Sequence, residues 1–260
     1  MTVDYQEHGE PGPGEPLVLL HGIGETSGIW TPVLPYLRDR RVLCVDLPGF
    51  GGSAPVRGEP SPQRWAIAVR SLIDELGLDR PVVAGVSLGG WVALELAVLG
   101  RAGAVVAFSP AGLWADSLPA YSRGVLKALR SGSLHGGGRV VGGAPGGRAL
   151  AFPNYAHPRH IPAAELTAQL RSLAEAPGWD ATLAAMAERR FRGGRSLPVP
   201  VTVAWGARDV LLPRRMCLRT DELPAGTRLV TLPGCGHTPT WDDPPLIAQV
   251  IARALPASAA

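Results

Sequence analysis

The chain has 260 residues, a formal net charge of +3 and 46% hydrophobic residues, which is enough for one large domain with a sizeable core. The small charge and the lack of any lysine and arginine cluster argue against nucleic acid as a partner. No run of ~18 uncharged apolar residues occurs, and the N-terminus lacks a basic region followed by an apolar one. Cys44, Cys217 and Cys235 have no metal-like spacing. Composition therefore predicts a cytoplasmic protein with free thiols, no metal site and no membrane span.

Two parts of the chain show strands alternating with helices. The first part has strand patterns at 2–8, 17–20, 41–45, 82–86 and 104–108, and helical patterns at 30–38, 62–76 and 91–99. Ser61 is suited to cap the second of these helices, with Pro62 at its first position. The last part has strand patterns at 199–205 and 228–232, and helical patterns at 213–222 and 245–254.

The middle of the chain interrupts this alternation. Between 111 and 196 only helical fragments are expected, near 120–130, 163–176 and 182–191. Residues 131–148 hold eight glycines among eighteen residues, so we expect a mobile surface loop there. The sequence thus predicts a core domain of residues 1–110 and 197–260, with residues 111–196 inserted into it.

Alternating strands and helices predict an α/β fold with a doubly wound, mostly parallel sheet covered by helices on both faces. Ligands of such folds bind beyond the carboxyl ends of the strands. The residues that directly follow predicted strands are 21–24, Ser87, Asp209 and His237. Groups capable of chemistry therefore meet at one edge of the sheet.

Ser87 lies at a corner between a strand and a helix. The run 82–86 is apolar, and Ser87 stands between Gly85 and Gly89 before the helical pattern that starts at Trp91. Such a corner strains the backbone of its central residue, and small neighbours are needed where a Cβ would clash. The pattern predicts that the serine hydroxyl is presented at the edge of the sheet.

An alcohol is a poor nucleophile at neutral pH, so Ser87 needs a base, and the base needs an acceptor that fixes its tautomer. His237 and Asp209 are suited to these two roles. Asp46 follows another predicted strand and is the rival carboxylate. The order serine, aspartate, histidine, each just past a strand, is the order found in α/β-hydrolases.

Five stretches resemble motifs of the α/β-hydrolase fold superfamily, in the same order along the chain: HGIG, DLPGFGGS, GVSLGG, WGARDVLLP and GCGHTPTWDDP. The resemblance covers the chain from about 17 to 245, except the insertion. It implies that Ser87 is the nucleophile, His237 the general base and then acid, and Asp209 the orienting carboxylate. It also implies an oxyanion hole made by the amides of Ile23 and Leu88, and it implies no cofactor.

The same resemblance bears on the remaining candidates. It favours Asp209 over Asp46, because the family places its acid in a WGxxD-like loop, and His21 resembles the residue that organises the oxyanion loop. It implies that the insertion is a helical cap over the serine. Aromatic residues of this cap, among them Trp114 and Trp179, could contact an apolar substrate or could equally pack the cap itself. Gly24 and Thr238 are further candidates for substrate contact.

These features predict a serine hydrolase of the carboxylesterase kind, acting on a small to medium apolar ester or lactone through an acyl-enzyme. One alternative is a hydrolase of carbon-carbon bonds in vinylogous diketones, since Ser-Pro-Ala-Gly-Leu at 109–113 is similar to that branch. Another is a non-catalytic ligand-binding protein on the same scaffold. Haloalkane dehalogenases and epoxide hydrolases of this fold carry a carboxylate at the corner, so Ser87 counts against both. The sequence leaves the substrate and the oligomeric state, monomer or homo-oligomer, open.

Overall fold

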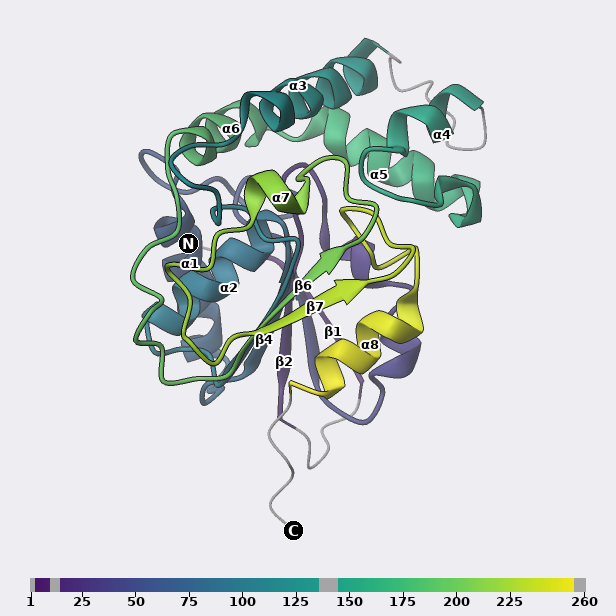
Figure 1. Ribbon diagram of the computed structural model, residues 1–260. Coiled ribbons are helices and arrows are strands. Elements are labelled where there is room, and N and C mark those ends of the chain that lie inside the picture. The colour runs from purple at the N-terminus through teal and green to yellow at the C-terminus, as the bar shows by residue number, and fades with distance from the viewer. Residues whose placement is uncertain (1–2, 10–14, 136–144, 255–260) are drawn as a thin grey trace.

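The framework of the protein is a twisted sheet, seen in a computed structural model that describes residues 3–9, 15–135 and 145–254 (Figure 1). In this part of the chain the sheet has seven strands in the order β1-β3-β2-β4-β5-β6-β7. β1 is antiparallel to β3, and all other neighbours are parallel. The strands are β1 (Tyr5–His8), β2 (Leu17–Leu20), β3 (Val42–Val45), β4 (Val82–Val86), β5 (Ala104–Phe108), β6 (Val201–Gly206) and β7 (Arg228–Leu232). The predicted doubly wound, mostly parallel sheet is confirmed.

Helices surround the sheet on three sides. They are η1 (Ser27–Trp30), η2 (Leu34–Tyr36), α1 (Pro62–Glu75), α2 (Leu88–Val98), α3 (Ala120–His135), α4 (Pro145–Ala151), η3 (Pro158–His160), α5 (Ala163–Glu175), α6 (Trp179–Ala187), α7 (Arg214–Cys217) and α8 (Pro244–Ala252). α1 and α2 cover one face and α8 the other, while α3 to α6 form a layer above the carboxyl ends of the strands (Figure 1). The strands β2 to β6 are buried along their whole length, which explains why nearly all of their residues are apolar.

Three local predictions were wrong. The glycine-rich segment 131–148 was expected to be a loop, but α3 continues to His135 and α4 begins at Pro145; residues 136–144 lie outside the described residues. Tertiary packing overrides the low helix propensity of glycine there, since Ser133 is buried and Gly132 packs against Leu150.

The other two differences also have local causes. The pattern at 30–38 forms the short 3₁₀ turns η1 and η2, because Pro32 and Pro35 lack the amide that a longer helix needs. The pattern at 213–222 forms only the single turn α7, since the chain then turns away and the Arg219 amide donates to the Leu113 carbonyl 2.6 Å away.

The apolar core is divided by the sheet into two large clusters. The cluster on the α1 and α2 side also contains Leu126 of α3, Leu173 of α5 and Leu183 of α6, so the helical layer shares its core with the sheet. A separate small cluster holds the α4 to α5 part of that layer together: Ala151, Tyr155, Ile161, Leu166 and Leu170.

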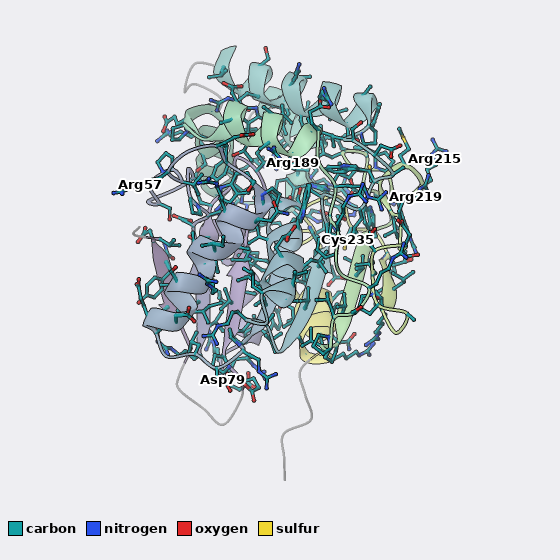
Figure 2. The ribbon with its side chains drawn as sticks, turned by 90° about the vertical axis from the view of Figure 1, so that its left-hand side faces the viewer. Arg57, Asp79, Arg189, Arg215, Arg219 and Cys235 are labelled. Carbon is teal, nitrogen blue, oxygen red and sulfur yellow. The ribbon has the colours of Figure 1, made fainter. Side chains whose placement is uncertain are left out.

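All three cysteines are free, as predicted, and all three are buried. In Figure 2 the label of the buried Cys235 falls within the outline of the protein, while Arg57 and Arg215 lie at its periphery. Burial raises the pKa of each thiol to about 12, so the nucleophilic thiolate is scarce at neutral pH. No helix among the described residues is long and apolar enough to span a bilayer.

Candidate active site

Ser87 occupies a strained corner between β4 and α2. Its φ is 53° and its ψ is −114°, a left-handed conformation that is costly for a residue with a side chain. Three backbone hydrogen bonds hold it: the Ser87 amide donates to the Phe108 carbonyl at 2.9 Å, and the Ser87 carbonyl accepts from Ala111 at 3.0 Å and from Trp91 at 3.1 Å. The surrounding structure thus stabilises the conformation that turns the hydroxyl away from the strand.

The two flanking glycines permit this corner. A Cβ at Gly85 would lie 2.3 Å from the carbonyl carbon of Gly89, and a Cβ at Gly89 would lie 2.5 Å from the carbonyl oxygen of Leu20. Both distances are too short for real contacts. The Gly-x-Ser-x-Gly pattern is therefore a steric requirement of this corner.

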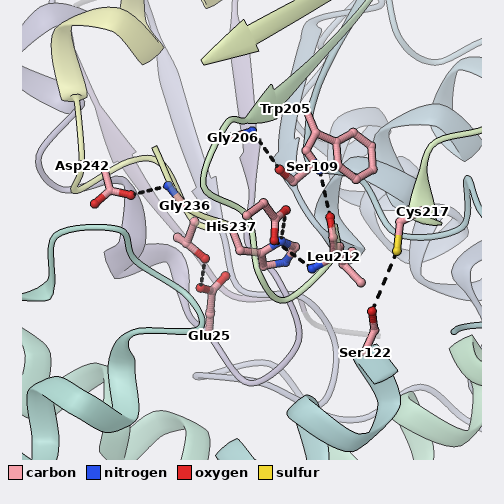
Figure 3. A network of polar contacts seen from close by, with 12 residues as sticks. Glu25, Ser109, Ser122, Trp205, Gly206, Leu212, Cys217, Gly236, His237 and Asp242 are labelled. Carbon is pink, nitrogen blue, oxygen red and sulfur yellow. Dashed lines mark hydrogen bonds and ion pairs between the residues drawn. The ribbon is translucent and has the colours of Figure 1, made fainter. Parts of the chain in front are cut away.

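His237 and Asp209 are hydrogen-bonded to each other beyond β7 and β6. Asp209 Oδ2 lies 2.8 Å from His237 Nδ1, and Asp209 Oδ1 accepts from the Leu212 amide at 2.8 Å (Figure 3). The histidine side chain is 3% exposed and that of the aspartate 0%. His237 Nε2 is buried and has no partner among the described residues. With Nδ1–H donated to the carboxylate, Nε2 is left as a proton acceptor.

Ser87 and His237 line a common cavity. Its volume is about 10 Å³, close to the space of one water molecule. The other residues that line it are Gly22, Ile23, Glu25, Leu126, Leu129, Asn154 and Leu211. Leu126 and Leu129 belong to α3, so the helical layer supplies part of the cavity wall.

Two backbone amides near this cavity have no hydrogen-bond acceptor in the part of the chain that the structure describes. Ile23 lies in the loop after β2 and lines the cavity, and Leu88 is the first residue of α2. Among the hydrogen bonds of the described residues, neither amide donates to a protein acceptor. Unpaired amides at a helix N-terminus and in an adjacent loop are the usual donors of an oxyanion hole.

Asp46 has a different environment from Asp209. Its Oδ1 accepts from the Ser27 amide at 2.7 Å and its Oδ2 from the Gly52 amide at 3.0 Å. The Ser53 hydroxyl donates to the Asp46 carbonyl at 2.5 Å. Asp46 therefore shapes the loop after β3, while His237 pairs with Asp209.

His21 joins two loops at the edge of the sheet. Its Nδ1 lies 2.7 Å from the Gly22 carbonyl, and its Nε2 accepts from the Leu47 amide at 2.8 Å. Burial lowers the pKa of His21, so the ring stays neutral and can accept at Nε2. This bonding holds the loop with Ile23 against the loop after β3.

The structure places the predicted substrate contacts outside the cavity wall. Trp114 packs edge-on against Trp91 with 5.7 Å between ring centroids, and its Nε1–H donates to the Arg189 carbonyl. Trp179 covers Gly24, where a Cβ would lie 2.6 Å from its ring. Both tryptophans are fully buried. In this structure both rings pack against other residues of the protein, and substrate contact by them stays a prediction.

Ser87, His237 and Ile23 line the cavity and were predicted, but several other residues of its wall were missed by sequence reasoning. Leu126 and Leu129 carry only the periodicity of an amphipathic helix, which is the same for a core position and for a cavity wall. Asn154 and Leu211 lie in irregular segments. Glu25 had a signal, because it directly follows the HGIG stretch.

The loop that carries His237 is joined to the helical layer. Asp242 accepts from the Gly236 amide at 2.8 Å, from Ala156 at 3.1 Å and from His157 at 2.8 Å. The Thr238 amide donates to the Asn154 carbonyl at 2.8 Å. Figure 3 shows Asp242 beside Gly236 at one end of this loop. Movement of the segment between α4 and η3 is therefore coupled to the histidine loop.

The sequence profile of the alpha/beta hydrolase family matches residues 17–250, and the chain belongs to this family. It is similar to epoxide hydrolase EphH of Mycobacterium tuberculosis, with 32% identity over 191 residues that cover 70% of this chain and 89% of the relative. It is also similar to a pimeloyl-(acyl-carrier protein) methyl ester esterase of Legionella pneumophila, with 39% identity over 99 residues that cover 38% of this chain and 37% of the relative.

Solved structures agree on the fold. A thermophilic esterase from Thermogutta terrifontis superimposes with a TM-score of 0.73 at 22% identity, covering 96% of this chain and 92% of the esterase. The family match and the 32% identical relative show that the protein is an enzyme of the alpha/beta hydrolase family.

Proposed function

We propose that the protein is a serine hydrolase that cleaves a small to medium apolar ester or lactone through an acyl-enzyme. One observation carries the proposal. His237 pairs with Asp209 through Nδ1, keeps Nε2 buried and without a partner among the described residues, and shares a cavity with Ser87. A free Nε2 beside a strained serine is what a general base for that hydroxyl requires.

The proposed reaction has two steps. Ser87 Oγ attacks the carbonyl carbon while His237 Nε2 takes the hydroxyl proton, and Asp209 stabilises the imidazolium. The amides of Ile23 and Leu88 bind the negative oxygen of the tetrahedral intermediate. The intermediate collapses when His237 protonates the leaving alkoxide. Water then attacks the acyl-enzyme by the same route, which releases the acid and frees Ser87.

In the same proposal, residues 111–196 act as a cap on a core formed by 1–110 and 197–260. Leu126 and Leu129 of α3 face the serine cavity and are nearly fully buried. Apolar side chains on this side of the cavity favour binding of an apolar acyl group. Since the cavity holds about one water, the cap must open for the substrate to enter.

Epoxide opening, the reaction in the name of one relative, fits Ser87 poorly. A carboxylate that opens an epoxide forms an ester, which water can hydrolyse. A serine alkoxide would form an ether instead, and an ether has no carbonyl for water to attack. Ester cleavage is therefore the better match to a serine at this corner.

A screen of nitrophenyl esters of graded acyl length tests the proposal, together with labelling by a fluorophosphonate. We expect Ser87→Ala and His237→Ala each to lose on the order of 10⁴-fold in kcat, with the double variant hardly slower because the residues act as a unit. Labelling should be lost in Ser87→Ala. Additive losses, or labelling elsewhere, would refute the triad. Turnover of a coloured vinylogous dienolate without ester turnover would instead support carbon-carbon bond hydrolysis.

A further inference from the structure

Glu25 is a buried acid on the wall of the serine cavity. Glu25 as a whole residue is only 8% exposed. Glu25 Oε2 accepts from the Gly22 amide at 2.8 Å, and Oε1 accepts from the Thr238 hydroxyl at 2.7 Å. Figure 3 shows Glu25 below the His237 loop, and a dashed line marks its hydrogen bond with the Thr238 hydroxyl. One carboxylate therefore bonds to two different loops.

The two loops carry the groups that the proposed reaction needs. Gly22 directly precedes Ile23, whose amide is a proposed oxyanion donor, and Thr238 directly follows His237. A Cβ at Gly22 would lie 2.6 Å from Glu25 Oε2 and 3.2 Å from the Cβ of Ser87. The Glu25 carboxylate thus lies close to the proposed nucleophile as well, although Glu25 is not a member of the proposed triad of Ser87, His237 and Asp209.

Stability alone does not explain this acid. Glu25 has no cationic partner among the ion pairs of the described residues. Removing a carboxylate from water is costly when no cation compensates for it. An apolar side chain at this position would fill the same space without that cost. A function other than packing is therefore expected of the two hydrogen bonds.

We propose that Glu25 is a positioning residue that fixes the oxyanion loop relative to the general base through Thr238. The inference rests on the proposed function. The base and the oxyanion donor must both reach one tetrahedral centre, and a misplacement of about 1 Å can cost on the order of 10²-fold in rate. The Glu25 bridge holds the two loops in register by a path that passes through neither Ser87 nor Asp209.

The test measures kcat and KM on a nitrophenyl ester for a set of single variants. Thr238→Val keeps the shape of the side chain and removes the hydroxyl, and we expect kcat to fall ~10- to 100-fold with KM within about 3-fold, because the bridge acts on the reacting geometry. Thr238→Ser restores the hydroxyl and should recover most of kcat. Unchanged kcat in Thr238→Val would overturn the bridge.

Variants of Glu25 separate geometry from charge. In Glu25→Gln the amide oxygen can accept from Gly22 and the amide N–H can donate to Thr238 Oγ, so we expect kcat within about 5-fold of wild type. Glu25→Ala should resemble Thr238→Val, and the double variant of Glu25→Ala with Thr238→Val should be hardly slower than either. If Glu25→Gln is as slow as Glu25→Ala, the charge is what matters and the bridge is refuted.

Thr240→Val is the matched control. Thr240 lies in the same loop and is fully buried, and its hydroxyl has no partner among the described residues. Its kcat should equal that of wild type. An equal loss in Thr240→Val and Thr238→Val would show that any change in this loop is harmful, which overturns the specific bridge.

Fluorophosphonate labelling distinguishes failure of this inference from failure of the proposed function. If wild type is labelled at Ser87 and Thr238→Val is labelled at the same rate, the bridge alone is refuted. If wild type is not labelled at Ser87, the proposed function fails and the positioning role fails with it. We expect labelling of wild type and of Thr240→Val, with labelling of Thr238→Val ~10-fold slower or more.

Discussion

Glu95 in α2, the helix that begins directly after Ser87, should make the protein less stable as the pH rises. The residue is 5% exposed. Its Oε1 accepts from Trp91 Nε1 at 2.9 Å and from Gln63 Nε2 at 2.5 Å. Burial raises the pKa of Glu95 to about 7, although these two hydrogen bonds act to lower it.

The size of the effect follows from the two states of the carboxyl. In the unfolded chain a glutamate has a pKa of about 4.3, and each pKa unit corresponds to about 1.4 kcal/mol. Between these two pKa values the folded state holds a proton that the unfolded state has lost, so stability falls as pH rises. The contribution of protonated Glu95 is complete below about pH 4.3 and is lost by about pH 7, with a total of about 4 kcal/mol.

Glu95→Gln tests this reasoning, because the amide keeps the acceptor oxygen for Trp91 and Gln63 and cannot ionise. We expect the free energy of unfolding of Glu95→Gln, relative to wild type, to increase by ~2 to 3 kcal/mol between pH 5 and pH 8. Urea unfolding at both pH values, with the slope of each transition compared, measures the difference. The same difference between the two proteins at both pH values would refute the assignment of a buried, protonated Glu95.

Two further predictions concern the carboxylates near the site and the α3 leucines that line the cavity. Asp209→Asn should lower kcat by on the order of 10³- to 10⁴-fold with the fold intact, whereas Asp46→Asn should mainly destabilise the loop after β3, by about 1 to 3 kcal/mol. Ester kinetics and thermal unfolding of both variants measure these effects. A larger loss of kcat in Asp46→Asn than in Asp209→Asn would contradict the geometry. Leu129→Ala should raise kcat/KM for longer acyl chains relative to short ones and cost about 2 to 5 kcal/mol in stability. Leu170→Ala, at a buried position of α5 in the separate small cluster, is the control that should cost stability without changing the acyl preference.

The sequence by itself determined the sheet and the residues at its carboxyl edge. Buried strands such as 82–86 are continuous apolar runs, so their positions are visible without knowledge of their neighbours. The steric demand at the Ser87 corner is equally local, because Gly85 and Gly89 are adjacent in sequence to the residue that they accommodate. The proposed triad and the fold class followed from these local signals and from their order along the chain.

Tertiary structure decided what surrounds those residues. Helical periodicity places Leu126 and Leu129 on a buried face, but whether that face meets the sheet or the serine depends on where the whole helix docks. The sequence likewise left open whether Trp114 and Trp179 contact a substrate or pack the protein, and only the structure shows their rings packed against Trp91 and Gly24.

The bond between Glu25 and Thr238 joins residues 213 positions apart. Glutamate and threonine are common residues with no spacing rule between them, so a contact of this kind leaves no pattern in the chain. It exists because parallel strands bring the ends of β2 and β7 to the same edge of the sheet, where loops distant in sequence come within hydrogen-bonding distance of one another.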